Sequence, residues 1–109
     1  MLWKSYGVSA LTVYFLSVSA QAGELDVLKG KYAFNWRADP ALTKCTKIAG
    51  PLFSEIKSKR FRCDLKPKSN TSTDVPARTC SEGENGKEYL IFDSKKACED
   101  ERETQASNE

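Results

Sequence analysis

The chain has 109 residues, four cysteines and no histidine, and its 17 Lys and Arg against 15 Asp and Glu leave a formal net charge of +2. Because histidine is the commonest base for serine and cysteine nucleophiles and the commonest metal ligand, its absence argues strongly against triad hydrolases. The six glycines are scattered rather than gathered in a phosphate-binding loop. We expect no catalytic residues, no cofactor and no metal site.

The first 22 residues predict a cleavable secretory signal. Lys4 precedes a run of apolar and small residues, VSALTVYFLSVSA, and a small-x-small sequence ends at Ala22. A spanning helix needs about 20 mostly apolar residues, so this run is too short and too rich in serine. A retained N-terminal anchor is the alternative. We expect a mature domain of residues 23–109, secreted or periplasmic, with no transmembrane segment and a polar, partly frayed C-terminal end.

All four cysteines lie beyond the predicted cleavage point, and an even number in a small exported chain predicts two disulfides. Structural zinc sites use closely spaced pairs such as C-x-x-C, but here 17, 16 and 17 residues separate neighbouring cysteines. We therefore expect covalent bonds, not metal ligation, at Cys45, Cys63, Cys80 and Cys98.

Two apolar patterns follow the signal. Residues 31–37 alternate aromatic with small or polar residues, which predicts a strand whose aromatic face enters the core: Tyr32, Phe34 and Trp36. A ligand-contacting aromatic surface is the alternative. Apolar residues then recur at three-residue and four-residue spacing on either side of Gly50-Pro51, which predicts two short helices or one kinked helix over residues 40–58.

The second half predicts a strand, a hairpin and a helix. From Arg60 the period changes to two, with Phe61, Cys63 and Leu65 on one face. A polar loop spans residues 67–76, and Asn85-Gly86 between two strand-like runs predicts a hairpin turn. Asp93 or Ser94 can cap a final helix that runs to about Gln105. The order predicts an α+β fold, a small antiparallel sheet with short helices packed on one face.

The predicted hairpin register suggests how the cysteines pair. A turn at Asn85-Gly86 places Cys80 opposite Ile91, and a helix that returns over the sheet brings Cys98 to the same level. Before the polar loop, the predicted helix runs away from Cys45 and the strand from Arg60 returns about as far by Cys63, which would join Cys45 with Cys63. The preferred pairs are therefore Cys45 with Cys63 and Cys80 with Cys98, and Cys45 with Cys98 is the main competitor.

The charges are segregated along the chain. Residues 29–68 carry eleven Lys or Arg against three acids, or +8, whereas residues 69–109 carry five against ten, or −5. The densest basic stretch can bind phosphate or sulfate groups, or can simply keep one sheet face soluble and discourage edge-to-edge pairing: Lys57, Lys59, Arg60, Arg62, Lys66 and Lys68. Since no exposed aromatics are interleaved with it, we expect no specific nucleic-acid recognition.

Two further patterns supply candidate functional residues. Asn70-Thr71-Ser72 matches the N-glycosylation acceptor, which matters if the source is eukaryotic. Five carboxylates could supply a sugar-cleaving pair, although a solvated acidic face explains them more simply: Glu82, Glu84, Glu88, Asp93 and Glu99.

The sequence thus predicts an exported non-enzymatic protein that acts by surface contacts with a macromolecular partner, as an inhibitor, adaptor or host-interaction factor. The alternative is a binder of anionic polymers or membrane headgroups through residues 57–68. A carboxylate-based hydrolase is the third hypothesis.

Overall fold

The computed structural model describes residues 22–108, so the predicted signal lies outside the described residues except for Ala22. Five antiparallel strands form one sheet in the order β2-β1-β5-β4-β3. The strands are β1 (Tyr32–Asn35), β2 (Thr46–Lys47), β3 (Arg62–Lys68), β4 (Ala77–Ser81) and β5 (Glu88–Phe92). The helices are a 3₁₀ helix (Ala22–Leu28), α1 (Gly50–Ile56) and α2 (Lys95–Ser107). The predicted α+β class with two disulfides is confirmed.

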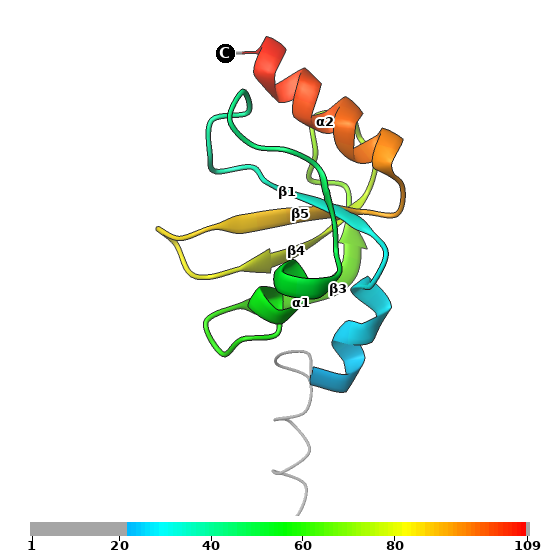
Figure 1. Cartoon of the computed structure of the whole chain (residues 1–109). Coiled ribbons are helices and arrows are strands. Elements are labelled where there is room, and N and C mark those ends of the chain that lie inside the picture. The colour runs from blue at the N-terminus through cyan, green and yellow to red at the C-terminus, as the bar shows by residue number, and fades with distance from the viewer. Residues whose placement is uncertain (1–21, 109) are drawn as a thin grey trace, which may run out of the picture.

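The helices cover both faces of the sheet instead of the single face that the sequence predicted (Figure 1). Successive strand residues point to opposite faces. On one face, here called the α1 face, Ala33 and Ile91 pack with Phe53 of α1 and Leu28 of the 3₁₀ helix. On the other, the α2 face, a second cluster includes Phe34, Leu90, Phe92 and Cys98. Residues Tyr89 to Phe92 of β5 are all buried, and they point alternately to the two faces. Each face of the sheet is therefore covered by other parts of the chain.

The predicted hairpin between β4 and β5 is confirmed, but its register differs by two residues, since Cys80 pairs with Tyr89. The loop closes between Glu82 and Lys87. The Glu82 amide donates to the Lys87 carbonyl over 2.9 Å, and the Lys87 amide donates to the Glu82 carboxylate over 2.9 Å. Gly83 has a φ of 104°, which favours glycine, so the chain reverses over four residues and not two.

Both preferred disulfide pairs are wrong. The bonds are Cys45–Cys98, the predicted competitor, and Cys63–Cys80. Cys80 belongs to the cluster on the α1 face and Cys98 to the cluster on the α2 face, so the sheet separates them. Cys63 lies directly opposite Cys80 on the neighbouring strand, with 4.0 Å between the Cα atoms.

The predicted helix over residues 40–58 is present only as α1. Residues 39–42 form a turn, and Thr46–Lys47 pair with β1 as β2. Leu42 is 82% exposed whereas Ile48 is fully buried, so the apolar spacing of this segment does not mark one helical face.

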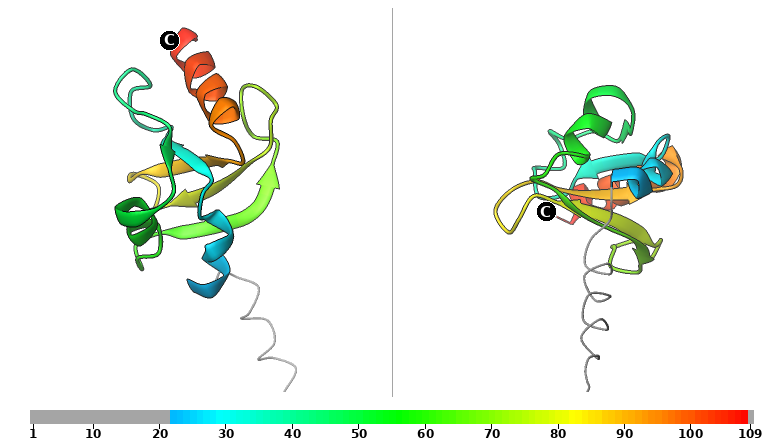
Figure 2. Two further views of the ribbon diagram at one scale, coloured as in Figure 1. Left: turned by 45° about the vertical axis from the view of Figure 1, so that its right-hand side comes forward. Right: turned by 90° about the horizontal axis from the view of Figure 1, so that it is seen from below.

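Helix α2 docks with little apolar surface. Ser94 caps it as predicted, because the Ser94 hydroxyl accepts the Ala97 amide over 3.1 Å. Only Cys98 and Glu101 are buried along the helix. The helix stands between the loop that follows β1 and the loop of residues 69–76 (Figure 2), and polar or covalent contacts fix it to both. None of the helices within residues 22–108 is long and apolar enough to cross a membrane.

Candidate functional site

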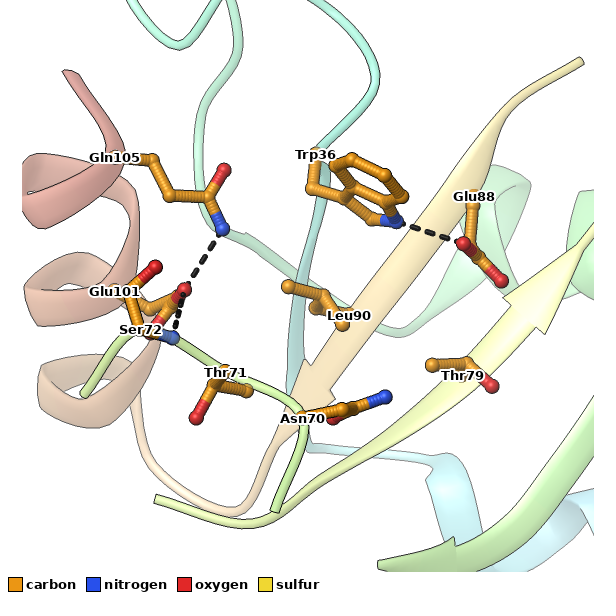
Figure 3. A pocket seen from close by; sticks show the side chains of 9 residues that line it. All are labelled: Trp36, Asn70, Thr71, Ser72, Thr79, Glu88, Leu90, Glu101 and Gln105. Carbon is orange, nitrogen blue, oxygen red and sulfur yellow. Dashed lines mark hydrogen bonds between the residues drawn. The ribbon is translucent and has the colours of Figure 1, made fainter. Parts of the chain in front are cut away.

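A cleft of about 430 Å³ opens on the α2 face, between the sheet, α2 and the loop of residues 69–76, here called the 69–76 loop. Figure 3 shows its side chains arranged around Leu90 of β5. Strands β1, β4 and β5, helix α2 and the 69–76 loop or their ends supply the lining, which consists of Trp36, Asn70, Thr71, Ser72, Thr79, Glu88, Leu90, Glu101 and Gln105. A volume of this size lies in the range of about 300–1,000 Å³ that is usual for ligand sites.

Glu101 of α2 holds the loop wall of the cleft. Its side chain is fully buried, and its carboxylate accepts the Ser72 amide over 2.9 Å and the Thr73 amide over 3.0 Å. The Thr73 hydroxyl and the Gln105 side-chain amide donate to the same carboxylate over 3.0 and 2.7 Å. Burial alone would raise the pKa of Glu101, but these hydrogen bonds outweigh it, so the pKa lies below its ordinary value. The 69–76 loop is therefore fixed to α2.

Trp36 forms the opposite wall and is 40% exposed. Its indole N–H donates to the Glu88 carboxylate over 2.8 Å (Figure 3). The Arg37 guanidinium lies 5.7 Å from the centre of the indole ring and 3.4 Å from the same Glu88 oxygen. Arg37 also donates to the carbonyls of the hairpin loop. The indole is thus held in one orientation while part of its surface stays open.

The predicted aromatic face divides along its length. Phe34 is fully buried and Tyr32 is half-buried, both packed in the cluster on the α2 face. The prediction that the face enters the core is therefore correct for Phe34 and wrong for Trp36. The reason is that α2 covers only part of the sheet, and the side chain of Trp36, beyond the end of β1, reaches the uncovered part.

Several polar atoms at the cleft make no hydrogen bond to any other residue within residues 22–108. They are the side-chain amide of Asn70, the Thr79 hydroxyl, Gln105 Oε1 and Glu88 Oε2. None of the nine lining residues is lysine or arginine. The cleft therefore combines an apolar patch, the part-exposed Trp36 indole beside the nearly buried Leu90, with donors and acceptors that remain available to a ligand.

The six basic candidates are all exposed, but they are not one stripe on a regular strand. Three lie in or beside the connection from α1 to β3, and three lie in β3 itself, an edge strand whose register is irregular between Asp64 and Lys68. Arg60 lies 3.5 Å from Glu82, and Lys68 lies 2.8 Å from Asp64. As predicted, Phe61, Cys63 and Leu65 face the other way and pack on the α1 face.

The five carboxylate candidates lie apart. Glu82 closes the hairpin loop, in which Glu84 is exposed. Asp93 accepts Lys31 over 2.9 Å and Arg78 over 3.0 Å, and the contact with Lys31 is the main reason that the pKa of Asp93 is lowered. Glu99 pairs with Arg102 over 3.1 Å. Of the five, only Glu88 lines the cleft, where it is joined by Glu101.

Sequence reasoning missed Glu101, Gln105 and Thr79. Glu101 and Gln105 follow the buried Cys98 at three-residue and four-residue spacing, which places them on one face of a helix. That spacing could have predicted that Glu101 and Gln105 lie on the same side of the helix as Cys98. Asn70, the predicted glycosylation acceptor, is exposed and lies at the edge of the cleft.

In the described part of the chain, no three Cys, Asp or Glu side chains gather in a way that could hold a metal ion. No protein-family model, curated protein or solved structure matches this chain.

Proposed function

We propose that this protein is an exported, non-enzymatic binding protein that recognises a macromolecular partner with the cleft on the α2 face. The observation that carries this proposal is that the cleft is built from fixed walls. Glu88 and Arg37 hold Trp36 on one side, and Glu101 holds the 69–76 loop on the other. Preorganised walls lower the entropy cost of binding. The two disulfides support the proposal that the protein resides in an oxidising compartment, outside the cell or in the periplasm.

The carboxylates of the cleft favour binding over acid–base catalysis. A general acid at neutral pH needs a raised pKa, but the pKa of Glu101 is lowered. Both oxygens of Glu101 already accept two hydrogen bonds each. Glu88 shares one oxygen between Trp36 and Arg37. Both groups thus act as structural acceptors that orient the walls.

Filling the cleft is expected to abolish partner binding. The variant Asn70→Trp places a large side chain at the cleft edge from an exposed position and disturbs no hydrogen bond of Asn70 to another described residue. The matched control is Asn85→Trp, the same change at an exposed position in the hairpin loop. The measurement is the retention of extracellular and cell-surface material from the source by each immobilised protein, analysed by quantitative mass spectrometry. We expect components that the wild type and Asn85→Trp retain and that Asn70→Trp loses at least tenfold. Equal retention by all three proteins would refute the cleft as the recognition site.

The basic residues support a second candidate function, binding of an anionic polymer. Within residues 22–108, no carboxylate lies within 4 Å of the charged groups of four of the six, Lys57, Lys59, Arg62 and Lys66. Ammonium and guanidinium groups without acidic partners are available to phosphate or sulfate groups. Lys57 is partly engaged, because its ammonium lies 4.8 Å from the centre of the Phe53 ring.

Heparin binding tests this second function. If the basic residues form a polyanion site, affinity for heparin is strongest at low ionic strength. The logarithm of the binding constant then falls linearly with the logarithm of the salt concentration. The double variant Lys59→Ser/Arg62→Ser then shows a shallower salt slope than Lys44→Ser/Lys47→Ser, which removes the same charge from another part of the surface. No retention on heparin at low salt, or equal slopes for the two double variants, would eliminate the polyanion site.

A further inference from the structure

We infer that the cleft binds a neutral sugar ring, a pyranose unit of a glycan carried by the partner. This inference rests on the proposed function, since it names the chemistry that the cleft recognises. The supporting observations are the charge of the lining, its unused polar atoms and the open face of Trp36.

The charge of the lining excludes strongly ionic ligands. None of the lining residues is lysine or arginine, so the lining offers no cationic partner to a phosphate, sulfate or carboxylate. A cationic ligand finds no carboxylate with both oxygens free. The carboxylate of Glu101 is saturated by four donors, and the charge of Glu88 is balanced by the guanidinium of Arg37. A ligand of this cleft is therefore neutral.

The unused polar atoms exclude a purely apolar ligand. Such a ligand would displace water from the Asn70 amide, the Thr79 hydroxyl and Gln105 Oε1 and would give these groups no hydrogen bond in return. Leaving buried polar groups without partners opposes binding. The neutral ligand therefore carries several hydrogen-bonding groups of its own.

A sugar ring is neutral and carries several hydrogen-bonding groups, so it meets both requirements. One face of a pyranose presents C–H groups, which can stack on the exposed indole of Trp36 and contact Leu90. Its rim carries hydroxyls, each of which both donates and accepts. Asn70 can donate and accept, Thr79 can do either, and Gln105 Oε1 and Glu88 Oε2 can accept. Figure 3 shows these groups on different sides of Leu90 and Trp36.

Intrinsic fluorescence tests the proposal directly. The chain has two tryptophans, and Trp3 falls in the predicted signal, so Trp36 is the reporter of the exported protein; Trp3→Phe isolates it if the signal is retained. The probes are soluble hexamers of N-acetylglucosamine, β-1,3-linked glucose, β-1,4-linked glucose and mannose. We expect at least one of them to change the Trp36 emission in a saturable way. If none does so at millimolar concentration, the inference is wrong.

Variants then locate the binding. By titration calorimetry with the probe that binds, Trp36→Ala is expected to weaken affinity at least ~10-fold and Thr79→Val ~3-fold or more, because these changes remove the stacking surface and one hydroxyl. The control Leu42→Ala alters a side chain that is 82% exposed and lies outside this cleft, and it should leave affinity unchanged. Unchanged affinity in Trp36→Ala would place the sugar elsewhere and overturn the proposal.

The two proposals fail in different ways. If Asn70→Trp loses the partner but the partner remains bound after its glycans are removed enzymatically, the proposed function stands and the sugar inference is refuted. If Asn70→Trp and Asn85→Trp retain the same material, both are refuted. Loss of retention on deglycosylation, together with a probe that reports at Trp36, supports both.

Discussion

Replacing Cys45 and Cys98 together with serine is expected to lower the free energy of unfolding by about 4 kcal/mol, against about 3 kcal/mol for replacing Cys63 and Cys80. The first bond joins residues 53 apart in sequence and the second joins residues 17 apart. In the chain-entropy model, the bond that closes the longer loop restricts the unfolded chain more. Urea unfolding of the two double variants measures the difference.

The loss of the Cys45–Cys98 bond also has a local effect. Cys98 and Glu101 are the only buried residues of α2. Without the bond, little apolar contact with the sheet remains to hold the helix in place. We expect the amides of α2 to exchange with solvent faster in the Cys45→Ser/Cys98→Ser variant, while those of β4 and β5 change less. A larger loss of stability in the Cys63→Ser/Cys80→Ser variant, or wild-type protection of α2 without its bond, would contradict this role of the disulfide.

Replacing Glu101 with alanine is expected to cost about 3 kcal/mol and to release the 69–76 loop from α2. The change leaves the amides of Ser72 and Thr73 without their acceptor, a carboxylate that is itself fully buried. The matched control is Glu103→Ala on the same helix, whose side chain is 67% exposed and which should change stability by less than about 1 kcal/mol. Thermal or urea unfolding gives both values. Equal effects of the two substitutions would show that Glu101 does not fix the loop.

Acid should weaken the same contact. The pKa of Glu101 in the folded protein lies below its ordinary value, so its contribution to stability is fully present above the pKa of the unfolded chain, about 4.3. This contribution is lost as the pH falls through the folded pKa. Glu101→Gln should therefore lose less stability than the wild type between about pH 5 and pH 2. Parallel stability curves for the two proteins over that range would rule out this linkage.

Local patterns in the sequence predicted much of the fold. Alternation predicted β3, which begins at Arg62, and β1, and Asp93 or Ser94 predicted the start of α2. The pairing of the cysteines was wrong because it depends on which face each helix covers, a tertiary property. The continuous apolar run Tyr89 to Phe92 is typical of a strand buried on both faces, and it was the clue that α2 and α1 lie on opposite sides.

The cleft could be predicted only in part. The aromatic alternation drew attention to Trp36, but its exposure depends on how much of the sheet α2 covers. Glu101 sits within an acidic run, EDERE, that is typical of a solvated helix surface. Its burial follows from the disulfide that places the Cys98 face of α2 against the sheet, and local sequence carries no direct sign of the loop that donates to it.

The cleft has a fixed wall where the sequence shows only a polar loop. Residue-resolved hydrogen exchange tests it without any ligand. The amides of Ser72 and Thr73, which donate to buried Glu101, should exchange at least ~100-fold more slowly than those of Glu84 and Asn85 in the hairpin loop, and Glu101→Ala should abolish that protection. Exchange of Ser72 and Thr73 in the wild type at the rate of an unstructured peptide would contradict the fixed wall and, with it, the proposed binding cleft.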